Sequence, residues 1–498
     1  MTLDLLLLIG ALVVLAALLA TKIGERLGLP SLILFLALGI ILSFNPHLTL
    51  YDAKLAHDLG FAALVLILIE GGLSTKWAEI RPVVVPAVLL ASVGIGITIG
   101  LQALFGFYVL GIPLAAAVLL AAILAPTDSA AVFSVLRHVP LPAKVRSVLE
   151  GESGLNDAPT VLLVTAATQL ALGHMNRGSD LWVTGALIIG ELAGGIALGV
   201  VFGFIGVQVL RRLALPASGL YPLAVIGWAV AAYGLGVVAH VSGFAAVYVC
   251  AVLLGNGKLP HRHAARSFAD GIAWIAQIGL FVMLGLLTHI WTITPRQVLV
   301  GILGGIFLTV VVRPVAVWIC TVPFRWPRAV KIFVSWGGLR GAVPIVLATI
   351  PMEAGLIYAT EIFDITFVAV VFLTIINGPT LPWVAKKLGL AGDPLEVDIE
   401  VAPLDIMEAD MVTVTVSEHS RLHGVAVFEV GLPKNTQISL IIRGDKMFTP
   451  QDRDIIRTGD QLLIVCPSAK RTQVEERLRL IDRSGRLGGW LRRSANRD

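Results

Sequence analysis

Two aspartates lie inside apolar stretches of the sequence, where a charged side chain costs about 3 kcal/mol or more unless it has a partner or a function. Asp128 follows Pro126 about 15 residues into one apolar run, and the proline removes a helix hydrogen bond, so the helix is expected to break there. Asp157 falls about ten residues into the next run, or about 15 Å deep at about 1.5 Å per residue. Both carboxylates are therefore predicted to reach the middle of a bilayer.

Further oxygen atoms surround these two carboxylates. Glu152, Ser153 and Asn156 share about one and a half helical turns with Asp157. Thr127 adds a hydroxyl group and a freed backbone carbonyl beside the predicted break. Hard oxygen ligands suit an alkali cation and suit a transition metal poorly. We therefore expect a monovalent cation site here. An alternative stays open for Asp128, namely that it only caps the broken helix.

Two arginines also lie inside apolar runs. Arg340 stands in a second helix-breaking sequence, Gly337–Gly341, where it is predicted either to offset the carbonyl ends of broken half-helices or to pair with Glu152. Arg313 is predicted to pair with Glu70, unless Glu70 reaches the cytoplasmic surface instead. Glu191, which lies among glycines, receives no role.

The composition places the chain in a membrane. Of its 498 residues, 57% are hydrophobic and 14% are charged, which is too apolar for a soluble globular protein. Runs of about 20 apolar residues recur from Leu3 to about Lys387 and predict about thirteen helical spans. Asp4 stands where a signal peptide would carry basic residues, so the first run is read as a membrane helix. The three cysteines lie too far apart in the sequence to suggest a metal or redox site.

The basic residues predict the orientation. Outside the C-terminal tail, most lysines and arginines fall in alternate loops, and the other loops carry only Lys54, Arg177 and Arg296. The positive-inside rule then places the N-terminus outside the cell membrane and, for an odd number of spans, the tail in the cytoplasm. Topology explains the basic residues, so no nucleic-acid partner is expected. Thirteen spans also permit two inverted six-helix repeats, in which the broken fifth and twelfth spans correspond.

The tail is predicted to form a small α+β domain. Residues 1–390 form the predicted membrane domain, 391–404 an acidic linker, 405–482 the compact domain and 483–498 a basic tail. Strands are expected at 411–417, 437–443 and 461–466, and an amphipathic helix at 469–481.

These motifs resemble the NhaP/NHE-type monovalent cation/proton antiporters. The likeness rests on Thr127-Asp128 in the fifth span, on the ESGLND sequence at 152–157 and on Gly337–Gly341 in the twelfth. It implies a homodimer of thirteen-helix protomers, each with a dimerisation part and a moving core. By the same resemblance, Asp157 is the ion-binding carboxylate. Glu152, Ser153 and the Thr127 backbone lie near the ion, while Asn156 holds the geometry.

The tail resembles the TrkA-C (RCK C-terminal) ligand-sensing domain through IRTGDQLLIVCP at Ile456 to Pro467. This likeness implies a small-molecule ligand of unknown identity. No GxGxxG sequence occurs in the tail, so neither NAD nor another cofactor is expected.

The expected activity is transport and not enzymatic catalysis. A buried carboxylate can hold a proton or a cation, and exchange follows if only the loaded carboxylate crosses between inward and outward states. Asn156 replaces a second aspartate of an electrogenic relative, which favours electroneutral exchange of one K⁺ or Na⁺ for one H⁺. An intramembrane aspartyl protease is an alternative interpretation, but the GxGD sequence of such proteases does not occur in this chain. A gated cation channel or uniporter is another, although no TVGYG-like filter occurs. The tail makes K⁺ the better candidate by resemblance.

Overall fold

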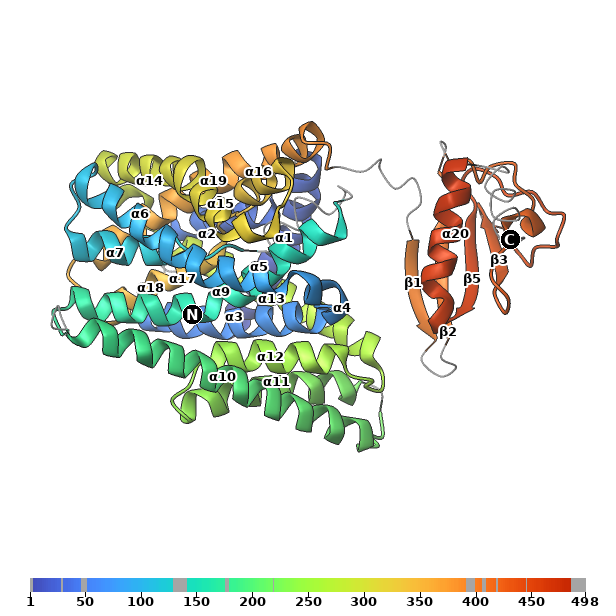
Figure 1. Cartoon of the computed structure of the whole chain (residues 1–498), viewed down its shortest axis with the longest axis horizontal. Helices are drawn as coiled ribbons and strands as arrows, with labels where there is room; N and C mark the ends of the chain where they lie inside the picture. The colour runs from blue at the N-terminus through green and yellow to red at the C-terminus, as the bar shows by residue number, and fades with distance from the viewer. Residues whose placement is uncertain are drawn as a thin grey trace. The chain divides into compact units, whose positions relative to one another are not determined.

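The computed structural model of the chain divides into two compact units, Met1–Gly392 and Asp393–Asp498. It describes residues 3–27, 30–45, 52–128, 141–174, 179–217, 219–390, 399–404, 409–417, 420–444 and 446–484. The first unit is helical, and the second is a small sheet with one long helix (Figure 1).

The first unit is built from apolar helices joined by short connections. They are α1 (Leu3–Leu27), α2 (Ser31–Ser43), α3 (Ala53–Ser74), α4 (Trp77–Ile80), α5 (Val84–Leu89), α6 (Ile95–Tyr108), α7 (Leu114–Ile123), α9 (Ala143–Ala171), α10 (Ser179–Arg212), α11 (Leu220–Val238), α12 (Gly243–Asn256), α13 (Arg262–Leu287), α14 (Pro295–Phe307), α15 (Arg313–Thr321), α16 (Arg328–Trp336), α17 (Ala342–Leu347), α18 (Thr349–Glu353) and α19 (Ala359–Lys387).

The described residues contain 8 helical segments that are long and apolar enough to cross a membrane. Shorter apolar helices occur at 31–43, 114–123, 243–256 and 342–353, and α9, which carries the ESGLND sequence, is 29 residues long. A membrane protein with many helices is therefore what the sequence predicted. The number of thirteen crossings, like the inverted repeat, stays a prediction.

These helices pack as two bundles. The first bundle contains α1, α2, α3 and α10 to α13, and the second contains α5 to α7, α9 and α14 to α19. In Figure 1, α10, α11 and α12 lie along one side of the unit, and α6, α14, α15 and α19 lie along the opposite side. The bundles meet where α3 packs on α17 and α18, and where α9 packs on α10 and α12.

Both predicted helix breaks are present in the second bundle. Helix α7 ends at Ile123 and the chain has no regular secondary structure from Ala125 to Asp128, because Pro126 lacks an N–H and disfavours helical geometry in the residue before it. The second break separates α16 from α17 at the glycine-rich segment Gly337–Gly341. The backbone N–H of Asp128 donates to the Leu339 carbonyl at 2.9 Å, so the two breaks touch. The continuation of the fifth span, 129–140, lies outside the described residues.

Two further irregularities lie beside the breaks. A five-residue π-helical turn, η2 (Leu90–Gly94), separates α5 from α6, and a second one, η4 (Leu308–Val312), separates α14 from α15. Each π turn packs against the helix that follows the other π turn: η2 contacts α15, and η4 contacts α6. Because a π turn adds one residue, it rotates the side chains that follow it around the helix axis. Arg313 comes directly after η4 and is placed by this rotation.

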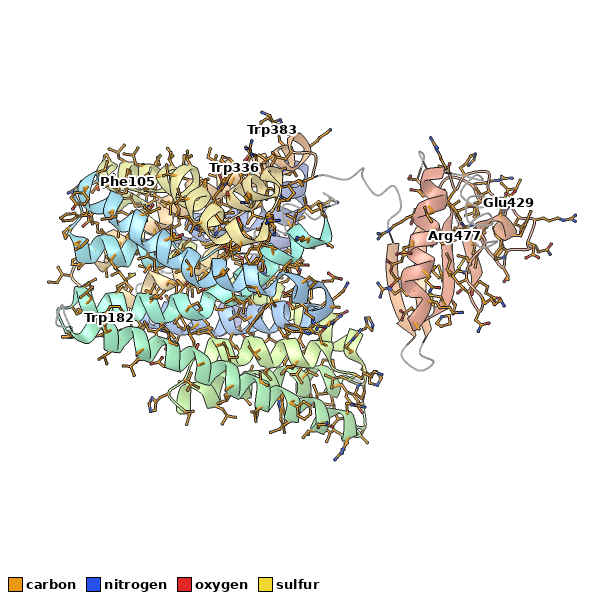
Figure 2. The ribbon with its side chains drawn as sticks, in the orientation of Figure 1. Phe105, Trp182, Trp336, Trp383, Glu429 and Arg477 are labelled. Atoms are coloured by element: carbon orange, nitrogen blue, oxygen red, sulfur yellow. The ribbon has the colours of Figure 1, made fainter. Side chains whose placement is uncertain are left out.

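The second unit is a five-stranded antiparallel sheet. Its strands are β1 (Ile399–Leu404), β2 (Ala409–Thr415), β3 (Gln437–Arg443), β4 (Lys446–Phe448) and β5 (Gln461–Pro467), in the order β1-β2-β5-β3-β4. Helix α20 (Arg471–Ser484) contributes the buried Val474 and Leu478 to the same core as Val414 and Ile464. Arg477 of α20 donates from Nε to the Val430 carbonyl at 3.0 Å (Figure 2).

One boundary prediction was wrong. Residues 399–404 were expected to belong to the linker, yet they form β1, in which Ile399 pairs with Val414 and Val401 with Val412. Glu400 and Pro403 suggested a linker, but β1 is an edge strand, where a missing N–H is tolerated. Of the predicted basic tail 483–498, residues 485–498 lie outside the described residues.

Candidate ion-binding site

The most strongly paired charge near the breaks is Glu152 of α9. Its side chain is 3% exposed, and Arg313 of α15 donates from Nη1 to Oε1 at 2.6 Å and from Nη2 to Oε2 at 2.8 Å. The expected pairs Arg313–Glu70 and Arg340–Glu152 are therefore wrong. The carboxylate of Glu70 instead accepts a hydrogen bond from Ser74 at 2.8 Å. Both oxygens of Glu152 face a guanidinium, which favours a role as an anchor, and its role as a cation ligand stays a prediction.

Thr127 joins the first break to α9. Its carbonyl oxygen accepts hydrogen bonds from Ser153 Oγ at 2.8 Å and from Asn156 Nδ2 at 3.5 Å. Its hydroxyl oxygen accepts from Asn156 Nδ2 at 2.8 Å and donates to Glu152 Oε1 at 3.4 Å. All four side chains are buried. The structure thus brings together Thr127, Ser153 and Asn156, which the sequence predicted to be neighbours.

Asp128 lies against the second break. A β-carbon added to Gly341 would come within 1.7 Å of Asp128 Oδ2, so the glycine leaves the space that the carboxylate fills. Gly341 immediately precedes α17, and the N-terminal end of a helix favours a negative charge. The carboxylate is half-buried. It therefore lies where it can balance the positive end of a half-helix.

Arg340 lies in the same break and is 1% exposed. Its Nη1 donates to the Gly338 carbonyl at 3.5 Å, and its own carbonyl accepts from Thr374 Oγ1 of α19 at 2.9 Å. Its charge acts on both Arg313 and Glu152. The contact with a carbonyl in the break favours the first of the two roles predicted for Arg340, which stays a prediction.

Asp157 has a carboxylate oxygen, Oδ1, that is buried and has no hydrogen-bond partner among the described residues, and the amide oxygen of Asn156 is also buried without one. The Asp157 carboxylate also feels the charge of Asp128. A buried carboxylate oxygen without a donor is unfavourable unless a proton, a cation or water satisfies it. Asp157 is therefore the group at this site that is best able to take up a positive charge.

The ionisable groups of the site carry a small net negative charge. The cluster contains three carboxylates, Glu152, Asp128 and Asp157, and two guanidiniums, Arg313 and Arg340. If all five groups are ionised, the cluster carries a net charge of about −1. A single monovalent cation or a single proton would neutralise it.

Sequence reasoning missed two contributors. Arg313 was recognised as a buried charge, but only the π turn before it decides which carboxylate it meets. Pro159 lies inside α9, where it cannot donate to the Leu155 carbonyl. That carbonyl is freed within one turn of Asp157, and the proline in the sequence was the signal.

Comparison with known proteins gives a consistent result over most of the chain. The family model "Sodium/hydrogen exchanger, transmembrane" matches residues 12–387, and the TrkA-C domain model matches residues 411–479. The K(+)/H(+) antiporter NhaP2 of Shewanella baltica is 32% identical over 470 residues, which cover 92% of this chain and 80% of the relative. The K(+)/H(+) antiporter NhaP of Alkalimonas amylolytica is 31% identical over 468 residues, or 91% of this chain and 80% of that one.

The fold has a counterpart among solved structures. The sodium proton antiporter MjNhaP1 from Methanocaldococcus jannaschii at pH 8 superposes with a TM-score of 0.65 at 22% sequence identity, covering 76% of this chain and 100% of that chain. At this level of identity the likeness concerns the arrangement of the helices.

Proposed function

The chain belongs to the sodium/hydrogen exchanger family, as its motifs predicted, and we propose that it exchanges one K⁺ or Na⁺ for one H⁺ at Asp157. The observation that carries the proposal is the buried Oδ1 of Asp157, which has no hydrogen-bond partner among the described residues. Thr127 and Ser153 would supply further oxygens. Glu152 and Asn156 would hold the site in shape, and Asp128 and Arg340 would balance the ends of the broken helices.

The charge of the cluster supports a one-to-one exchange. Its net charge of about −1 is cancelled equally by H⁺ or by one alkali cation, so the two loaded forms carry the same charge across the membrane. The empty form would keep a buried negative charge, which is costly in a medium of low dielectric constant. Only loaded sites would then cross, and the two ions would be coupled without net charge movement.

The two bundles supply the parts for alternating access. We propose that the second bundle, which holds the site, moves against the first, and that the first bundle forms a homodimer as the family resemblance implies. The chain would span the cell membrane with its N-terminus outside. The TrkA-C domain would lie in the cytoplasm and regulate exchange through a small molecule of unknown identity.

The relatives favour K⁺. NhaP2 of Shewanella baltica, which matches 92% of this chain, is named a K(+)/H(+) antiporter. The Na(+)/H(+) antiporter NhaH of Halobacillus dabanensis matches 57% of this chain at 31% identity. We therefore propose K⁺ as the principal cation, with Na⁺ as the alternative.

Proton flux in reconstituted vesicles tests the proposal. K⁺ and Na⁺ gradients are supplied separately, and Asp157→Asn is expected to abolish exchange with either. Asp364→Asn is the matched control because asparagine can still bond to Gln297, which contacts Asp364 at 3.2 Å. Exchange at the wild-type rate in Asp157→Asn would refute the assignment of the carboxylate.

Voltage separates the proposal from its rival. An electroneutral exchanger keeps its rate when a membrane potential is imposed, and it needs a counter-gradient. A gated channel or uniporter would instead carry a current down a K⁺ gradient alone. A voltage-driven current in the wild type would overturn the one-to-one stoichiometry.

A further inference from the structure

One histidine links the two bundles with both of its ring nitrogens. His57 of α3, in the first bundle, contacts α18 in the second. Its Nδ1 lies 3.2 Å from Thr349 Oγ1, and its Nε2 lies 3.3 Å from Glu353 Oε2. Thr349 and Glu353 stand four residues apart on the helix surface, so one imidazole ring spans them.

The hydrogen bonds determine the protonation state of this ring. The Thr349 hydroxyl donates its only proton to the Val346 carbonyl at 2.6 Å, so toward His57 its oxygen can only accept. An ionised carboxylate is also only an acceptor, and Glu353 faces the other nitrogen. Both contacts can be hydrogen bonds at the same time only if both ring nitrogens carry a proton, so this pair of contacts is complete in the imidazolium form of His57.

We propose that His57 is a second proton-binding site, separate from Asp157, and that its protonated form ties the two bundles together. The inference rests on the proposed function, because it assumes that the bundles move against each other during exchange. When His57 loses a proton, one nitrogen becomes an acceptor that faces another acceptor. The neutral ring then keeps one of the two contacts, and the charge of Glu353 loses its partner.

The contact lies at one end of the bundles. Glu353 stands a few residues before α19, which begins at Ala359, whereas the TrkA-C unit follows the opposite end of α19 at Lys387. In the proposed orientation, the His57 contact therefore faces the outside of the cell. The His57 side chain is 16% exposed and that of Glu353 is 37% exposed, so protons from that side can reach the ring.

The surroundings of His57 contain few other charges. Among the described residues, Glu353 of α18 and Asp58 of its own helix are the charged groups that act on the ring. The ring packs on Phe61 with centroids 4.1 Å apart. Phe61 in turn contacts Phe244 of α12, and Val346 of α17 covers the neighbouring Gly60. Within the described part of the chain, Glu353 is thus the partner whose ion pair depends on the proton.

The expected consequence is a pH dependence with a definite sign. Protonated His57 holds the bundles together, so exchange is slow when the outer medium is acidic and faster when it is alkaline. An imidazole in water titrates near about pH 6.5, within the range that a cell meets. Losing one hydrogen bond to a charged group changes an equilibrium by about tenfold, which sets the expected size of the effect.

Exchange is measured in vesicles with the pH varied on the side opposite the TrkA-C domain and held constant on the other side. We expect the wild-type rate to rise by up to about tenfold from about pH 5.5 to 8. In His57→Gln this rise should shrink, with a rate near that of the wild type at pH 8. His57→Arg, which stays cationic, should be slow throughout. His174→Gln is the matched control, since within the described part of the chain the His174 ring bonds only to Gln169 of its own helix end, at 3.0 Å. Its profile should match that of the wild type.

A second measurement does not depend on transport. The melting temperature of the purified full chain should fall as pH rises through the titration of His57, because the protonated contact is then lost. His57→Gln should lack this fall. Equal outer-pH profiles in active wild-type and His57→Gln proteins, together with equal melting profiles, would overturn the inference. An inactive wild type or an active Asp157→Asn would instead count against the proposed function and leave the melting test of His57 in place.

Discussion

The guanidinium of Arg313 donates to both carboxylate oxygens of Glu152, at 2.6 and 2.8 Å, and thereby connects α15 to α9 inside the second bundle. The same guanidinium fills the space beside Gly338, where an added β-carbon would lie 2.5 Å from Arg313 Nε. One ion pair therefore braces the helix that carries Asp157 and also contacts the second break. Any change in this pair should affect both stability and exchange.

Removing Arg313 alone should destabilise the protein more than removing both Arg313 and Glu152. Arg313→Met leaves the buried carboxylate of Glu152 without its partner, which costs about 3–5 kcal/mol. The double variant Arg313→Met/Glu152→Gln removes both charges of the pair and should be the more stable of the two. Melting temperatures of the solubilised protein measure the difference. A double variant that melts below Arg313→Met would contradict this account of the pair.

Gly341 is expected to tolerate no side chain. Its β-carbon would come within 1.7 Å of Asp128 Oδ2, so Gly341→Ala must displace either the carboxylate or the break. We expect exchange to fall by at least about tenfold, the effect of about 1.4 kcal/mol. Gly279→Ala in α13 is the control, because nothing lies within 4 Å of its added β-carbon. An alanine there should stabilise the helix by up to about 1 kcal/mol and leave exchange unchanged. Equal exchange rates in the two variants would refute the steric argument.

Thr127 should contribute to cation binding through Asn156. Thr127→Val removes the hydroxyl oxygen that accepts from Asn156 Nδ2 at 2.8 Å, and a buried donor without an acceptor costs about 1–3 kcal/mol. The KM for the cation should rise by about tenfold. Thr168→Val is the matched control because the Thr168 hydroxyl, which is also buried in α9, donates to the Val164 carbonyl of its own helix at 2.8 Å. If both variants shift the KM equally, the contact between Thr127 and Asn156 has no special role.

The buried charged residues could be recognised from the sequence, but the contacts between them could not. Asp128, Asp157 and Arg340 could be recognised because each interrupts an apolar run, and the breaks followed from Pro126 and the glycines of 337–341. Arg313 and Glu152 lie 161 residues apart, and a π turn that leaves no clear sequence signal sets the face that Arg313 occupies. The contact of His57 with α18 escaped prediction for a similar reason, because it depends on how two bundles pack.

The second unit should show an acid-sensitive stability that depends on Asp460. Its carboxylate is fully buried and accepts from Arg443 Nε and Nη2, each at 2.7 Å, and from the Arg457 N–H at 2.8 Å. Burial alone would raise the pKa of Asp460, but the hydrogen bonds from Arg443 and the Arg457 backbone outweigh it and hold the pKa below its ordinary value. A lowered pKa stabilises the folded form above the ordinary value of about 3.9, and this contribution is lost as pH falls through the folded pKa.

Hydrogen exchange of residues 399–484 in the full chain measures this effect. The wild type should stay protected from pH 7 down to about pH 4 and lose protection below that value. Asp460→Asn should lower the stability of the unit by about 2 kcal/mol at pH 7, because it loses hydrogen bonds to a charged group, and its protection should vary less with acid. Asp452→Asn, at an exposed aspartate of the same unit, is the control and should behave as the wild type. Equal acid profiles for the wild type and Asp460→Asn would show that another group sets the acid sensitivity of this unit.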